Sequence, residues 1–144
     1  MSETNKLKYI MPSQPTEKPV GDMSIITDYD QRYLNIISKI FNKQMSVDDL
    51  NDVLDTGGNI AAYWHKNRLV GAVVWTWDNA EGGEIKYIGF KKRVRGKGFA
   101  KKLLNYAIYT TTTKDNHIGD LPLTVSLPED DPNTNFFTKY GFKR

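Results

Sequence analysis

A basic loop with two glycines stands between a strand-like run and an amphipathic helix, and no other segment constrains the fold as strongly. The run covers residues 84–90, the loop holds Gly96 and Gly98, and the helix predicted over 99–112 carries apolar pairs on one face. Glycine lacks a Cβ, so the backbone can approach a ligand closely there. The first amides of a helix have no partner within it and suit an anion. The segment therefore predicts an α/β protein with a phosphate-type site at this turn.

Positive charge is concentrated around the same loop. Seven of the twelve residues from 91 to 102 are Lys or Arg and none is acidic, although the whole chain has a net charge of only +3. Arg93, Arg95, Lys97 and Lys101 surround the two glycines. This pattern favours a local anion site over a surface that coats nucleic acid.

The composition is that of one ordinary domain. The 144 residues are 39% hydrophobic, and no apolar run approaches the length of a membrane span. The first ten residues lack the apolar stretch of a secretory signal. The absence of cysteine excludes disulfides, Cys-ligated zinc and a Cys nucleophile, and we expect a cytoplasmic location. His65 and His117 stand in polar turns without metal-ligand neighbours, so we expect surface histidines and no metal.

The N-terminal segment differs in composition from the rest. Residues 1–21 contain Pro12, Pro15, Pro19 and Gly21 among polar residues, which predicts a flexible or extended arm with a short strand at 7–11. Residues 22–144 are then expected to form a single domain. Within it we predict a strand at 24–27, helices at 31–43 (capped by Asp28 or Asp30) and 46–57, strands at 60–64, 69–77 and 84–90, a helix at 99–112, a strand at 121–127 and a helix at 131–140. The whole is an α/β fold of about six strands and four helices.

Two segments resemble the GNAT superfamily of acyl-CoA-dependent N-acyltransferases. Residues 93–98 are similar to its Arg/Gln-x-x-Gly-x-Gly/Ala pyrophosphate loop, and residues 136–142 resemble the aromatic-x-x-x-Gly-Phe end of its last helix. The predicted order of elements is similar to that fold over residues 22–142. The resemblance implies a GNAT-like mixed central sheet and a direct transfer of acetyl from acetyl-CoA to an amine.

The same resemblance implies how acetyl-CoA is held. The amides of residues 95–100 receive the pyrophosphate, and the Phe90 amide bonds the thioester carbonyl. A gap between the strands at 84–90 and 121–127 admits the pantetheine arm. The family's asparagine before the last helix aligns with Asp130 here, and Asn133 is expected to take its role. The expected cofactor-binding residues are Ile88, Phe90, Arg93, Arg95, Gly96, Lys97, Gly98, Phe99, Ala100 and Asn133.

Candidate catalytic residues are Glu84 and Tyr140. Glu84 matches a glutamate that part of the family uses as general base, and the alternative is an exposed carboxylate at a strand end. The family's acidic tyrosine falls on Phe137 here, which has no proton to donate. Tyr140 lies three residues further on the same helix face and could replace it, whereas core packing is the alternative.

Several alternatives stay open. The family fold usually continues past Gly141-Phe142 into one more strand, so either the sheet lacks it, or the N-terminal arm or a partner chain fills its place. The chain could be a GNAT-like acyl-CoA-binding module without catalysis, or, less favoured, a nucleic-acid-binding protein using residues 91–102. The acceptor is a small amine, a protein lysine or an N-terminus, and the protein is a monomer or a homodimer.

Overall fold

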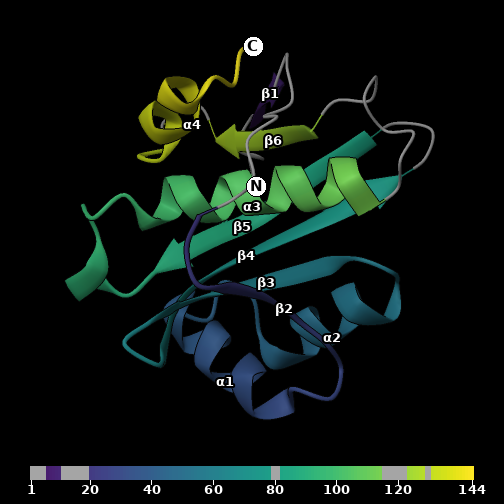
Figure 1. The fold of residues 1–144 in the computed structure, drawn as a ribbon. Helices are drawn as coiled ribbons and strands as arrows, with labels where there is room; N and C mark the ends of the chain where they lie inside the picture. Colours follow the sequence, from purple (N-terminus) through teal and green to yellow (C-terminus); the bar gives the residue numbers. More distant parts are fainter. Residues whose placement is uncertain (1–5, 11–19, 79–81, 115–122, 129–130) are drawn as a thin grey trace, which may run out of the picture.

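The predicted mixed α/β class is confirmed by a computed structural model, which describes residues 6–10, 20–78, 82–114, 123–128 and 131–144. Within these residues, six strands form one sheet and four α-helices pack on its two faces (Figure 1).

The strands follow the order β1-β6-β5-β4-β3-β2 across the sheet. The β5/β6 pair is parallel and the other neighbouring pairs are antiparallel. The strands are β1 (Lys6–Ile10), β2 (Met23–Ile26), β3 (Asn59–His65), β4 (Arg68–Asp78), β5 (Gly82–Phe90) and β6 (Leu123–Pro128).

The strand expected in the N-terminal arm is β1, and it completes the sheet next to β6. Its register runs antiparallel to that of β6, and Ile10 exchanges two backbone hydrogen bonds with Lys143, of 2.6 and 2.8 Å. Leu7 and Tyr9 pack on the core while Lys8 between them is exposed, as the two-residue period of a strand requires. Of the three alternatives for the family's last strand, the structure therefore shows the N-terminal segment in that place.

The helices lie in two layers. The helices α1 and α2 pack on one face of the sheet, and α3 and α4 pack on the other, each pair over its own apolar cluster. A single 3-10 turn, η1, precedes α3. The bounds are α1 (Gln31–Ile40), α2 (Val47–Asp55), η1 (Lys92–Val94), α3 (Phe99–Lys114) and α4 (Thr134–Tyr140).

The two helix starts on the first face illustrate how local signals behave. At α2, the Ser46 hydroxyl accepts from the Asp49 amide and the Asp49 carboxylate accepts from the Ser46 amide, which is the predicted capping box. At α1, Asp30 takes the N-cap position, but its side chain does not cap the helix. Its carboxylate accepts instead from the amide and hydroxyl of Thr27, since local bonds of this kind compete with capping.

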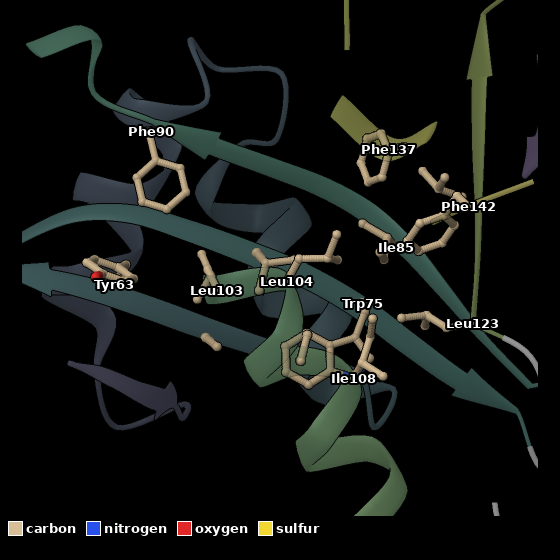
Figure 2. Packing of buried hydrophobic residues seen from close by; sticks show 14 of the residues in the cluster. Tyr63, Trp75, Ile85, Phe90, Leu103, Leu104, Ile108, Leu123, Phe137 and Phe142 are labelled. Carbon is tan, nitrogen blue, oxygen red and sulfur yellow. The ribbon is translucent and has the colours of Figure 1, made fainter. Parts of the chain in front are cut away.

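The core on the α3 face fixes the position of the glycine loop. Of the apolar residues predicted on one face of α3, Leu103, Leu104, Ala107 and Ile108 are 0–1% exposed, whereas Phe99 and Ala100 are partly buried. They pack on Trp75 of β4, and Figure 2 shows Phe90 at the far end of the same cluster, beside Tyr63. Residues 103–108 thus fix α3 on the sheet, and its N-terminus lies at the C-terminal end of β5.

Candidate functional site

The parallel strands β5 and β6 pair over only part of their length. The register runs from Gly83 opposite Leu123 to Ile85 opposite Val125, whereas β5 continues to Phe90. Beyond Ile85 the two strands are no longer paired. This is the position at which the resemblance placed a gap for the pantetheine arm.

Backbone donors of β5 face the side of this gap. The backbone amide of Lys91 donates to the Val70 carbonyl at 2.9 Å, so this amide points toward β4. Successive amides of a strand alternate in direction, and the amides of Ile88 and Phe90 therefore point away from β4. The carbonyl of Phe90 points the same way and accepts from Nε of Arg95 at 3.1 Å.

The glycine loop adopts a backbone that favours glycine. Gly96 has φ +83° and Gly98 has φ +81°, in the region that L side chains rarely adopt. A Cβ added at either would meet no atom within 4 Å, so the requirement is conformational and the surrounding space is open. The helix α3 begins at Phe99, and its first amides lack partners within the helix. The open space, the free amides and the nearby cations fit a pyrophosphate group.

Gly71 of β4 lies against the Phe90 ring, and the sequence analysis did not single it out. It pairs with Phe90, and a Cβ at Gly71 would lie 2.2 Å from two carbons of the Phe90 ring. The ring thus lies directly over a backbone without a side chain. An isolated glycine inside a predicted strand signals such a close approach and could have revealed it.

Strand β3 holds the start of α3 through aromatic contacts. The Tyr63 ring stacks on Phe99 with centroids 4.6 Å apart, and the His65 ring lies 5.0 Å from the same ring. Burial, and secondarily the carboxylate of Asp22, raises the pKa of Tyr63 above its usual value. His65 is half-buried against this ring rather than the plain surface residue expected, and His117 lies outside the described residues.

A cleft of about 380 Å³ opens between the glycine loop, the start of α3 and α4. Its lining combines aromatic rings with cations, which suits a ligand that has both an apolar arm and phosphates. It brings together seven residues predicted for the site: Phe90, Arg95, Gly96, Gly98, Phe99, Ala100 and Tyr140. It also contains Lys101, one of the cations expected around the two glycines, and three residues that were not predicted: Val94, Phe136 and Lys139.

Two predicted residues of the loop face elsewhere. Arg93 and Lys97 line a separate hollow of about 330 Å³, together with Lys66 and Arg68 at the β3–β4 turn. Ile88 is half-buried and packs on the α3-side core. These three residues are not in the described lining of the main cleft.

Asn133 is exposed and stands just before α4. Its backbone N–H donates to Oδ1 of Asp131 at 2.7 Å. This turn delays the helix, which begins at Thr134 rather than at residue 131 as predicted. Asn133 is also outside the described lining of the cleft.

Glu84 lies far along β5 from the end of the strand. Phe90 is six positions further along the strand, which corresponds to about 20 Å at about 3.3 Å per residue. Its carboxylate forms an ion pair with Lys86 at 2.7 Å, and both side chains are partly exposed. Such a pair holds the carboxylate only weakly. Glu84 can therefore exchange a proton with a group at Phe90 only through intervening groups such as water.

The position of the family's tyrosine lies in the core. Phe137 is 2% exposed, and its ring contacts those of Phe136 and Phe142. Tyr140 lines the cleft, and its hydroxyl donates to Oδ1 of Asn105 at 3.4 Å. Burial raises the pKa of Tyr140 to about 12. The phenol is thus a protonated donor across the neutral range.

Within the described residues, no group of three or more His, Cys, Asp or Glu side chains could hold a metal ion. No helix in that part of the chain is both long and apolar enough to cross a bilayer.

Comparison with known proteins agrees with this geometry. The sequence profile described as the Acetyltransferase (GNAT) family matches residues 23–142. No curated protein matches the chain. A GNAT-family structure from Novosphingobium aromaticivorans DSM 12444 superposes with a TM-score of 0.73 at 12% identity, over 96% of this chain and 59% of that one. A GNAT-family acetyltransferase from Colwellia psychrerythraea gives 0.74 at 17%, over 98% and 53%.

An aminoglycoside acetyltransferase from an uncultured soil sample, in complex with sisomicin, gives a TM-score of 0.66 at 14% identity, over 82% of this chain and 84% of that one. At such identities the likeness concerns the fold. The chain spans little more than half the length of the first two structures. The family profile, however, covers most of the sequence, and the chain belongs to the GNAT acetyltransferase family.

Proposed function

We propose that this chain transfers an acetyl group from acetyl-CoA directly to a primary amine, either of a small molecule or of a protein lysine or N-terminus. The observation that carries the proposal is the open glycine loop at the start of α3, which leads into the cleft beside Phe90. The family match supports acetyl-CoA as the acyl donor.

Each part of the cleft has a role in this proposal. The amides of residues 96–100, with the side chains of Arg95 and Lys101, bind the pyrophosphate, because a helix N-terminus and nearby cations stabilise anions. The Arg95 amide, expected as a further donor, instead donates to the Lys92 carbonyl at 3.2 Å. The rings of Phe99 and Phe136 contact the apolar part of the pantetheine arm. The amides of Ile88 and Phe90 face the gap and donate to the thioester carbonyl, which stabilises negative charge that develops on its oxygen.

The bound thioester supplies an activated acetyl group. The amine nitrogen bonds to the carbonyl carbon, the C–S bond breaks, and the amine proton passes to a base while the thiolate takes up a proton. Positioning both reactants in one cleft supplies much of the rate. The chain has no cysteine that could form an acyl-enzyme, which agrees with direct transfer.

We assign the base to Glu84, acting through water because of its distance from Phe90. Tyr140 donates a hydrogen bond to the departing sulfur. Full proton transfer from a phenol with a pKa of about 12 to a thiolate is uphill, because thiols have a pKa of about 8.5. A thiolate leaves readily near neutral pH even without an acid.

Binding and transfer are tested separately. Acetyl-CoA should raise the melting temperature and ATP should not, and no shift at saturating acetyl-CoA would refute the proposal. For the base, Glu84→Gln should slow transfer and alter its pH dependence. Lys86→Gln removes the ion-pair partner but keeps the carboxylate, and it should stay close to wild type.

A second candidate is an acyl-CoA-binding module without catalysis, which the burial of Phe137 at the tyrosine position favours. It predicts the same thermal shift but no labelled product from isotope-labelled acetyl-CoA in a cell lysate. A nucleic-acid-binding role for residues 91–102 would instead give a strongly salt-dependent gel shift. We further propose that the protein is cytoplasmic and acts as a monomer or a homodimer.

A further inference from the structure

We propose that the acceptor is a small amine that also carries a carboxylate or phosphate, and that it binds in a cationic hollow on the α1 side of Phe90. This inference rests on the proposed acetyl transfer and names the acceptor class for it.

The hollow lies between the C-terminal part of α1 and the end of β5, and its volume is about 410 Å³. Phe90 and Arg95 line both this hollow and the cofactor cleft. The two spaces therefore adjoin at the residue whose amide faces the thioester in our proposal. An amine in this hollow can approach the carbonyl carbon from the side that the pantetheine arm does not occupy.

The separate hollow around Arg93 and Lys97 is also cationic. Phe90 is absent from its described lining, so it does not adjoin the reacting carbonyl in the same way. This is why we place the acceptor on the α1 side.

The charge of the α1-side hollow is uniform. Among the residues that the structure describes, its lining contains Lys39, Lys91, Lys92 and Arg95 but no Asp or Glu. In the described part of the chain, the ion pair is that of Lys86 with Glu84, and none of these four cations is paired with a carboxylate in it. The bond from Arg95 Nε to the Phe90 carbonyl holds its guanidinium at the boundary of the two spaces. Because Arg95 binds the cofactor in our proposal, Lys39, Lys91 and Lys92 are the cations that can bind the acceptor's carboxylate or phosphate.

Two consequences follow for the acceptor. Four cations attract an anionic group and repel a polycation such as a polyamine or an aminoglycoside. The same cations disfavour the ammonium form of a bound amine and lower its pKa, which increases the neutral fraction that attacks a thioester. Ile36 and Ile40 add apolar wall, so an apolar body between the amine and the anion also fits.

The test uses the full chain, isotope-labelled acetyl-CoA and a small-molecule extract of cells. N-acetyl products are identified by mass spectrometry and sorted by charge at neutral pH. Acetylation removes the amine's charge, so the proposed acceptors give anionic products, simple amines give neutral ones and polyamines remain cationic. We expect the labelled N-acetyl products to be anionic. Neutral or cationic products, or label confined to protein, would overturn the inference and leave acetyl transfer intact.

A charge variant tests the hollow itself. Lys39 and Lys92 are exposed and lie outside the cofactor residues, so Lys39→Gln/Lys92→Gln should fold normally, which its melting temperature checks. We expect kcat/KM for the anionic acceptor to fall at least about tenfold, while the Kd of acetyl-CoA stays unchanged. Lys43→Gln is the matched control, because Lys43 is also exposed beyond α1 but outside the described lining.

Other outcomes separate the hypotheses. A higher Kd for acetyl-CoA with an unchanged acceptor KM would assign these lysines to the cofactor's phosphates and refute the acceptor role. An equal loss in Lys43→Gln would indicate a general field rather than a site, and would refute it as well. Binding of acetyl-CoA without any labelled product would support the non-catalytic module and remove both proposals of transfer.

Discussion

Replacing Gly71 with alanine tests how the sheet positions Phe90 in the site. The new Cβ would lie 2.2 Å from Cδ2 and Cε2 of the Phe90 ring and 2.7 Å from its Cγ. Carbon atoms in contact normally lie about 3.5–4.0 Å apart, so the ring must move by more than about 1 Å. Phe90 is only 6% exposed, and it packs within the α3-side core, so the movement disturbs its neighbours.

Overpacking of this kind lowers the free energy of unfolding by about 1–3 kcal/mol. For a chain of this size, each kcal/mol corresponds to about 3 °C in Tm. Because Phe90 also lines the cofactor cleft, we expect the Kd of acetyl-CoA to rise about tenfold, which corresponds to about 1.4 kcal/mol. Urea unfolding measures the first effect and isothermal titration calorimetry the second.

A double-mutant cycle isolates the contact. Phe90→Val removes the ring carbons that the new Cβ would strike, so Gly71→Ala should cost less than about 0.5 kcal/mol in that background. Equal losses with and without the ring would show that the destabilisation arises elsewhere in β4. An unchanged free energy of unfolding in the single variant would refute the reasoning outright.

Three further predictions address the loop, a helix cap and a titration. Gly98→Ala should lower the free energy of unfolding by about 1–2 kcal/mol, because alanine is strained at the φ of +81° found there. It should also weaken acetyl-CoA binding in calorimetry. Gly57→Ala, at φ +86° after α2, should lose similar stability with unchanged binding. Ser46→Ala should lose about 1 kcal/mol in urea unfolding without affecting the cofactor, and no loss would contradict the capping box. Burial raises the pKa of Tyr140 from 10.0 to about 12. The stabilisation linked to this shift is present below pH 10 and declines as the pH rises toward 12. The Tyr140→Phe variant should lack that decline in unfolding curves measured from pH 9 to 12.

Local signals were sufficient wherever neighbouring residues decide the structure. The apolar pairs of α3 repeat at helical spacing, and residues such as Leu103 and Leu104 are buried as that spacing predicts. The capping box at Ser46 and Asp49 forms because its two side chains and amides lie within one turn. Such patterns depend on contacts between residues three or four positions apart, which the order of residues specifies directly.

Other predictions failed, or were absent, because they depend on partners distant in sequence or on competing donors. Asp28 or Asp30 was predicted to cap α1; Asp30 takes the N-cap position, but its carboxylate accepts from Thr27 instead of capping the helix. The role of Gly71 depends on its register with Phe90 in the next strand. The predicted strand at 84–90 already placed Glu84 far from Phe90. Only the pairing of β5 with β6, which ends at Ile85, shows which part of β5 borders the gap.

The sequence by itself determined the basic loop, its two glycines and the helix that follows, because backbone freedom and helical period are properties of adjacent residues. The tertiary structure decided that the N-terminal β1 completes the sheet beside β6. It also decided that Lys39 of α1 lies beside Lys91 and Lys92 on the far side of Phe90. These features bring together segments that are tens of residues apart, and the packing of both faces of the sheet, rather than any local preference, sets their positions.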